Sequence, residues 1–203
     1  MTSCECEMEA KDAEQAKVLK VLLGINAVMF LVEGTVGLIA HSTGLIADSL
    51  DMLADAAIYG VSLYVVGRAV ASKLKAAYAS GIVECLLGLG VVVEVVRRAI
   101  MGSDPTSILM WSVGAVALGA NISCLALLSK HREGEIHMRA SWIFSANDVL
   151  ANLGVILAGV LVALLESRIP DLVIGAIIAV VVLSGGVRII AGARREAVGI
   201  TRE

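Results

Sequence analysis

The sequence predicts an all-α membrane protein with six transmembrane helices and both termini in the cytoplasm. Hydrophobic residues make up 58% of the 203 residues, against roughly 45–50% in an average soluble domain. Aromatic residues contribute only 3%, while the 20 glycines suit close packing of helices within a membrane. Six mostly apolar segments of about 20 residues or more, the length that crosses a bilayer, follow one another along the chain.

Each predicted span is separated from the next by a short polar connection. The first span, KVLLGINAVMFLVEGTVGLIA, is almost wholly apolar, whereas the second contains three aspartates. The remaining four are dominated by Val, Leu, Ile, Ala and Gly, and both prolines, Pro105 and Pro170, fall in connections on the same predicted side. We expect the spans at residues 17–40, 44–70, 76–100, 107–129, 139–165 and 171–193.

The distribution of Lys and Arg predicts the orientation, because cytoplasmic connections carry an excess of both. With the N-terminus inside, only Arg97, Arg98 and Arg168 of the 16 basic residues fall on the opposite side. The acidic N-terminal stretch lacks the basic start and short apolar core of a signal peptide. We therefore expect a multi-pass protein of the cell (inner) membrane of a prokaryote. The expected organisation is a cytoplasmic tail, one transmembrane domain and a second short tail with no soluble domain after it, at residues 1–16, 17–193 and 194–203.

The most informative residues are carboxylates inside the apolar spans. Asp48, Asp51 and Asp55 lie in the second span and Asp148 in the fifth. An aspartate at the centre of a membrane helix costs roughly 2.5–3.5 kcal/mol, so we expect these side chains to face a partner, water or a cation. At about 100° per residue the first three share one helix face, and Asp148 falls at a compatible depth. These positions are compatible with a shared site between the second and fifth spans.

Several carboxylates in a low-dielectric site cannot all stay ionised, so either a divalent cation or protons must neutralise them. Metal binding displaces protons from the same ligands, which predicts exchange of metal for protons. The alternative is that these aspartates bond to neighbouring helices or line an aqueous vestibule. For Asp48, nearer the outer edge, capping or lining the entrance is the favoured role.

Other polar residues within the spans have separate expected roles. Glu33 and Glu84 are expected to line the ion path or bind protons, because a glutamate facing lipid is costly. Asn26 and Asn121 are expected to form hydrogen bonds between helices. A structural ion pair is expected between Glu94 and one of the two arginines that follow it, Arg97 and Arg98.

The runs around the aspartates resemble those of the cation diffusion facilitator family, which exports divalent metals in exchange for protons. The run GLIADSLDMLADAAIYGVSLYVV is similar to that family's second span, where a D/H-x-x-x-D pattern is matched by Asp51 and Asp55. The run EVVRR at 94–98 resembles the end of the third span. The run HMRASWIFSANDVLANLGVILAGVL resembles the fifth span, and the matching residues are Met138, Arg139, Asp148, Gly154, Val155 and Ile156.

Two departures from the family pattern affect the expectations. Phe144 stands where the family usually has a histidine, so Ser145, Asn147, Asn152 or water would have to complete the ligand shell. The family's usual soluble C-terminal domain, which commonly supports dimerisation and senses metal, is not expected here. A homodimer is implied by the resemblance alone, and small residues of the third span could pack against the second copy, namely Gly81, Gly88 and Gly90.

The sequence thus predicts a proton-coupled antiporter, not an enzyme, that exports a divalent cation and holds no permanent cofactor. The predicted metal ligands are Asp51, Asp55, Asp148, Asn147, Asn152 and Asp48. Carboxylate donors by themselves suit Mn²⁺ or Mg²⁺ better than Zn²⁺. The resemblance nevertheless ranks Zn²⁺ first, because zinc-exporting relatives carry carboxylate-only pairs in the second span, and Fe²⁺, Mn²⁺, Co²⁺, Ni²⁺ and Cd²⁺ stay open. The expected partners are metal ions, protons and membrane lipid, with no nucleic acid.

Two other classes of function are weighed against transport. One is a metal-binding membrane interaction protein without transport activity. The other is an intramembrane aspartyl protease, which the absence of a Gly-x-Gly-Asp run disfavours. In the N-terminal tail, Cys4 and Cys6 could chelate a soft cation, but an acidic tail with reduced thiols is favoured. For His131 and His137 in the fourth connection, a solvated loop is favoured over a weak metal site.

Overall fold

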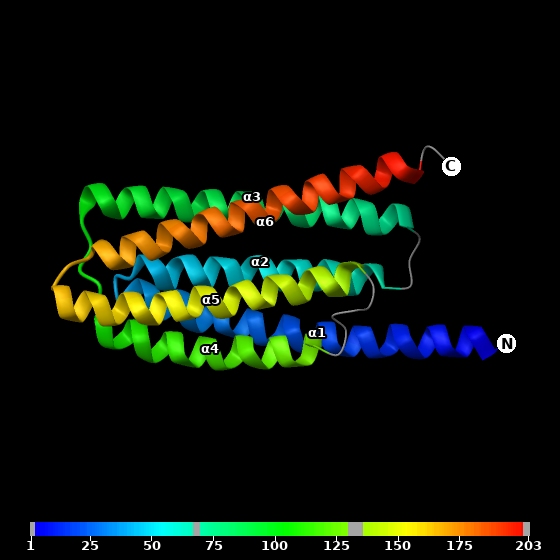
Figure 1. Ribbon diagram of the computed structural model, residues 1–203, viewed down its shortest axis with the longest axis horizontal. Coiled ribbons are helices and arrows are strands. Elements are labelled where there is room, and N and C mark those ends of the chain that lie inside the picture. The colour runs from blue at the N-terminus through cyan, green and yellow to red at the C-terminus, as the bar shows by residue number, and fades with distance from the viewer. Residues whose placement is uncertain (1–2, 67–69, 130–135, 201–203) are drawn as a thin grey trace.

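The computed structural model confirms an all-helical chain with six helices. Backbone positions are described for residues 3–66, 70–129 and 136–200, and side chains within 13–66, 74–129, 145–195 and 197. The helices are α1 (Ser3–Ile39), α2 (Thr43–Val65), α3 (Val70–Met101), α4 (Ser107–Ser129), α5 (Ile136–Leu165) and α6 (Ile169–Ile200). The two chain ends lie at the same end of the bundle (Figure 1). We call this the termini end and the opposite one the far end.

Five of the six helices are long and apolar enough to cross a membrane, which makes this a multi-pass membrane protein. They are the segments Ala13–Ile39, Leu74–Met101, Ser107–Ser129, Ser145–Leu165 and Ile169–Arg195. The exception is α2, whose three aspartates make it too polar by composition, although its 23 residues reach about 35 Å. Because α2 contacts each of the other five helices, much of its surface is shielded from lipid by protein.

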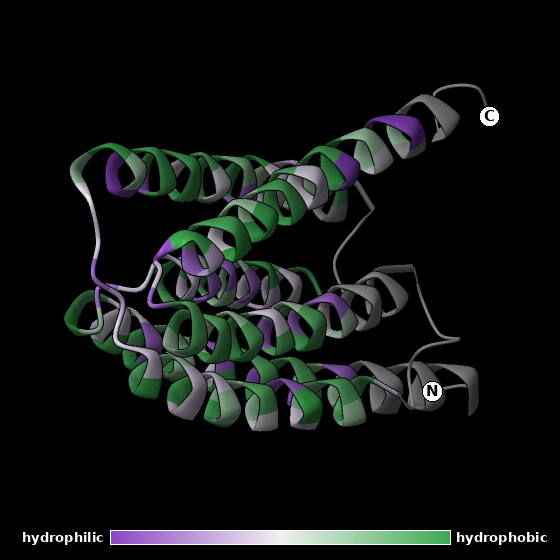
Figure 2. Ribbon diagram, turned by 60° about the vertical axis from the view of Figure 1, so that its left-hand side comes forward, coloured by the Kyte–Doolittle hydropathy of each residue, from purple (hydrophilic) through white to green (hydrophobic). Residues whose placement is uncertain are grey.

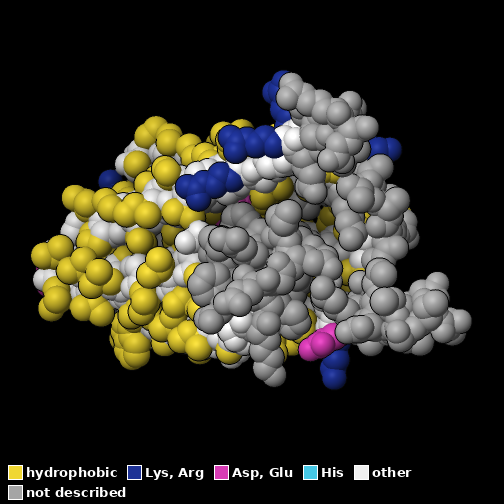
Figure 3. Space-filling model, turned by 45° about the vertical axis from the view of Figure 1, so that its right-hand side comes forward, with side chains coloured by type: hydrophobic (Ala, Val, Ile, Leu, Met, Phe, Trp, Pro, Cys, Tyr) yellow, Lys and Arg dark blue, Asp and Glu magenta, His cyan; other side chains and the backbone are white. Residues whose placement is uncertain are grey.

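The surface of the bundle fits a membrane environment. Large hydrophobic side chains such as Leu38, Ile100 and Leu164 are exposed, and Figure 2 shows hydrophobic residues along the outward faces of the helices. Hydrophobic side chains cover most of the described surface away from the termini end in Figure 3, and most Lys and Arg side chains in that view lie nearer that end. This placement agrees with the excess of basic residues expected on one side of the membrane.

Glycines allow α3 and α6 to lie in close contact. A Cβ added at Gly81 would meet Ile190 and the backbone of Gly186, and one at Gly88 would meet Leu183. The suggestion that these two glycines pack against a second copy is therefore wrong, because α6 of the same chain covers them. Only Gly90 of that trio has open space around it.

Replacing Gly186 with alanine is expected to destabilise the bundle by about 1–3 kcal/mol, the usual effect of overpacking. The new Cβ would lie 2.6 Å from Cys85 Sγ and 2.9 Å from the carbonyl oxygen of Gly81, and that backbone cannot easily move. Gly192→Ala on the same helix is the matched control, since nothing lies within 4 Å of its added Cβ. Thermal unfolding in detergent should show a lower midpoint for the first variant only. Equal midpoints would show that the α3–α6 contact is looser than described.

Candidate metal site

One pair of carboxyl groups, Asp55 and Asp148, which we call the inner pair, joins α2 to α5 inside the bundle. Asp55 and Asp148 are 6% and 8% exposed, and their carboxyl groups lie within hydrogen-bonding reach of each other. The Tyr59 hydroxyl also lies 3.4 Å from Oδ2 of Asp55 and donates to it. Two carboxyls can approach in this way only with a proton between them, or with a cation in its place. The sequence-based expectation that acidic residues of these two helices meet agrees with this geometry.

Asp51 lies one turn from Asp55 and is only partly buried. Its carboxyl group is within electrostatic range of Asp48 and Asp55 on α2 and of Glu84 on α3. Glu84 is itself buried, and its Oε2 has no hydrogen-bond partner among the described residues. The acidic character of the interior therefore extends from α2 toward α3 as well as toward α5.

A second carboxyl pair, which we call the outer pair, lies closer to the far end. Glu33 of α1 and Asp48 of α2 are 0% and 1% exposed and lie within hydrogen-bonding reach of each other. Apart from this mutual contact, both carboxyl oxygens of Glu33 and Oδ2 of Asp48 have no hydrogen-bond partner among the described residues. Asp48 is thus buried beside Glu33 and does not cap a helix.

Neutral oxygen atoms lie close to Asp148 along α5. Asn152 is fully buried, and its Nδ2 donates to the backbone carbonyl of Asp148 at 2.8 Å. That bond leaves the Asn152 Oδ1 unpaired, and the buried Ser145 hydroxyl is also without a partner in the described part of the chain. Positions three or four residues apart share a helix face, so both groups project on the same side as Asp148. Asn147 is partly buried.

The described side chains do not form a ready-made metal cage. No three His, Cys, Asp or Glu residues among them are close enough together to hold one ion. The arrangement consists of two carboxyl pairs, with Asp51 and Glu84 nearby. Coordination of one ion by Asp51, Asp55 and Asp148 therefore stays a prediction that requires Asp51 to turn toward the inner pair.

Several predicted residues lie outside the part of the chain whose side chains are described. They are Phe144, His131, His137, Cys4 and Cys6. Of the remaining polar residues, Asn26 donates from Nδ2 to Cys124 Sγ on α4 at 3.9 Å, which confirms a contact between helices. The Nδ2 of Asn121 is buried without a partner among the described residues, so the same expectation is wrong for that group.

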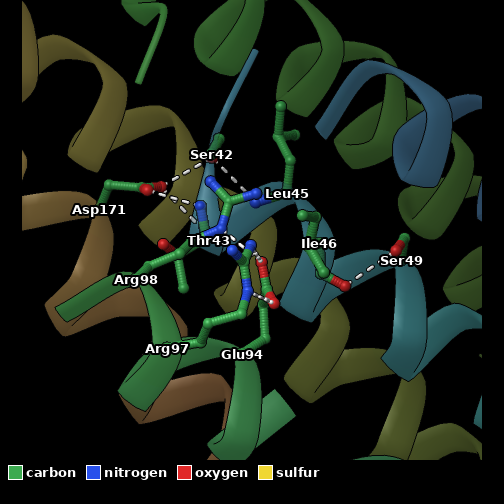
Figure 4. Close-up of polar contacts among 10 residues, drawn as sticks. Ser42, Thr43, Leu45, Ile46, Ser49, Glu94, Arg97, Arg98 and Asp171 are labelled. Atoms are coloured by element: carbon green, nitrogen blue, oxygen red, sulfur yellow. Dashed lines mark hydrogen bonds and ion pairs between the residues drawn. The ribbon is translucent and has the colours of Figure 1, made fainter. Parts of the chain in front are cut away.

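The ion pair expected after Glu94 involves both arginines. The Glu94 carboxylate accepts from Nε and Nη2 of Arg97 at 2.8 and 2.7 Å, and from Nε of Arg98 at 2.5 Å (Figure 4). Arg98 is buried, with only 3% of its surface exposed. The group joins residues of α3 alone, which agrees with a structural role.

Comparison with known protein families identifies the family of the chain. The family profile described as cation efflux transmembrane domain matches residues 19–196, which covers nearly all of the helical bundle. No curated protein matches the sequence. The chain belongs to the cation efflux family, whose members are membrane transporters of divalent cations and not enzymes.

Proposed function

We propose that the protein is a proton-coupled antiporter that exports a divalent cation from the cytoplasm. Among the candidate ions, Zn²⁺ ranks first. The observation that supports this most is the approach of the Asp55 and Asp148 carboxyl groups in the buried interface between α2 and α5. A metal ion can take the place of the proton that two adjoining carboxyls need. The ion is the cargo, and the protein supplies the oxygen atoms that hold it.

The ligand set that we propose combines three charged groups and one neutral group. Asp51, Asp55 and Asp148 supply carboxylates, and the unpaired Oδ1 of Asn152 supplies an amide oxygen. Three carboxylates exceed the charge of a divalent ion by one unit, which favours binding but also favours protonation once the ion has left. Asn147 stays a further candidate ligand.

Exchange follows from the competition for these oxygens. When the site faces the cytoplasm, the ion binds and the carboxyl groups release protons. When it faces the opposite side, the ion leaves and protons from that side restore the neutral form. In this scheme the outer pair, Glu33 and Asp48, carries protons and not the ion, because the neutral amide oxygen that completes the proposed ligand set, Oδ1 of Asn152, lies beside Asp148 of the other pair. A chain with its termini in the cytoplasm would place the outer pair nearer the release side.

Reconstituted vesicles test this function against the rival of a metal-binding protein without transport. With an imposed pH gradient, Zn²⁺ should accumulate on the more acidic side, with protons moving in the opposite direction, and the other divalent ions should follow with their own rates. A potassium gradient with valinomycin fixes the membrane potential, so that proton coupling is separated from electrical driving. Metal binding without any flux would support the interaction protein instead.

The remaining proposals concern the surroundings of the bundle. We propose that both termini face the cytoplasm of a prokaryotic cell and that the protein works as a homodimer. The first rests on the asymmetric placement of Lys and Arg, and the second on membership of the family.

A further inference from the structure

A carboxylate of α6 holds the start of α2 at the far end. The Asp171 Oδ1 accepts from the Ser42 hydroxyl at 2.7 Å and from the Gly44 amide at 2.9 Å, while Oδ2 accepts from the Thr43 amide at 2.5 Å (Figure 4). The Ser42 hydroxyl in turn accepts from the Leu45 amide at 3.1 Å. The first amides of a helix lack partners within it, and their positive field favours an anion. Asp171 is fully buried in this position.

One turn further along α6, Ile174 lies between the two helices that carry the inner carboxyl pair. A Cβ at Gly44 of α2 would lie 2.9 Å from Cγ2 of Ile174, and a Cβ at Gly154 of α5 would also meet the Ile174 side chain. On the next residue, a Cβ at Gly175 would lie 2.8 Å from Cγ2 of Thr43. The start of α6 therefore lies against both α2 and α5.

A buried apolar cluster continues inward from these contacts. It contains residues of α2, α5 and α6, among them Leu45, Ala47, Val155, Ala158 and Ile178. Beyond this cluster α6 diverges from α2 and follows α3 toward the termini end (Figure 1). The close contact of α2 with α6 is thus concentrated at the far end.

We propose that Asp171 and Ile174 form a closure at the far end, which must open before an ion bound by the inner carboxyl pair can leave on that side. The inference rests on the proposed transport function. A path from Asp55 and Asp148 to the far end has to cross the interface between α2 and α5, where Ile174 lies. Opening separates the start of α2 from α6 and breaks the three hydrogen bonds to Asp171. Asp171 is a positioning residue, since its carboxylate bonds to α2 and not to the ion.

A disulfide across the contact gives the sharpest test. In a background in which Cys4, Cys6, Cys85 and Cys124 are replaced by alanine, Thr43→Cys and Gly175→Cys are introduced together. The Cβ positions lie 3.3 Å apart, close to the roughly 3.5–4.5 Å that a disulfide spans. Oxidation should lower Zn²⁺ flux in vesicles by about tenfold or more, because helices that must part are held together. Reductant should restore the flux, and Zn²⁺ binding should survive oxidation.

Equal flux in the oxidised and reduced states would overturn the closure while leaving the transport function intact. Absence of flux from the wild-type protein would instead remove the transport function, and this inference with it. The two failures are therefore distinguishable.

A second variant keeps the inference testable if the double cysteine protein does not fold. Asp171→Asn loses one acceptor for the α2 amides, so the closure should open more often. A cysteine placed at buried Ala47 should then react several-fold faster with a membrane-impermeant maleimide applied from the far end. A cysteine at Ala117, buried in α4, is the control for general loosening. Unchanged labelling at position 47, or equal acceleration at both positions, would contradict the closure.

Discussion

Asp55→Asn is expected to lower the rate of Zn²⁺ flux in reconstituted vesicles by about 100-fold or more, since even changes to groups beyond the ligands commonly cost about 10–100-fold in metal affinity. The asparagine keeps the size of the side chain and its hydrogen-bond acceptor. It removes the charge that, with Asp148, balances a divalent ion.

Asp104→Asn is the matched control for this prediction. Asp104 is exposed in the connection between α3 and α4, so the same chemical change there should leave the flux within about twofold, as for most surface substitutions. If a folded Asp55→Asn protein transports Zn²⁺ at the wild-type rate, the inner carboxyl pair does not take part in transport.

Metal binding should release protons from the protein and weaken as the pH falls. If carboxyl groups share protons in the metal-free protein, each Zn²⁺ should displace about one to two protons, with apparent affinity falling about tenfold per pH unit for each proton displaced. The affinity falls at lower pH by mass action, because a higher proton concentration favours the metal-free, protonated form. Titration of the purified protein with Zn²⁺ in weakly buffered solution, followed with a pH indicator, measures the release.

The Asp55→Asn variant provides the control for the proton measurement. It should release fewer protons per ion at the same extent of binding. Zn²⁺ binding with no proton release, and with an affinity independent of pH, would contradict competition for shared oxygen atoms.

The sequence was sufficient to predict the helices because their apolar runs are long and their connections short. The expected fourth span coincides with α4 (Ser107–Ser129), where polar residues stand at both ends of a mostly apolar run. The second span was expected to reach residue 70, but α2 ends at Val65. That prediction rested on hydropathy alone. It did not take Gly67 as an end signal, although glycine commonly follows the end of a helix.

The partners of the acidic residues were harder to predict than their positions. Helical periodicity places Asp48, Asp51 and Asp55 on one face, but it does not say which neighbouring helix each side chain meets. The contacts of Asp48 with Glu33 and of Asp55 with Asp148 depend on the packing of α1 and α5 around α2. The position of Glu33 inside its span was the available signal, and it predicted only that this residue lines the ion path or binds protons.

No pattern in the sequence singles out Asp171 as a functional candidate. An aspartate after a proline at the start of a helix normally indicates the first turn of that same helix. The structure shows that its carboxylate instead bonds to the start of α2, 127 to 129 residues away in the chain. A contact of this kind follows from tertiary packing, because Gly44 and Gly175 allow the two helices to approach.

Equilibrium Zn²⁺ binding to the purified protein and to Asp148→Asn tests most directly whether α2 and α5 share one ion. The shared site predicts that this α5 variant loses high-affinity binding to the same extent as Asp55→Asn on α2, and that combining the two changes adds little further loss. Wild-type affinity in Asp148→Asn, alongside loss in Asp55→Asn, would place the ion on α2 without α5 and contradict the account.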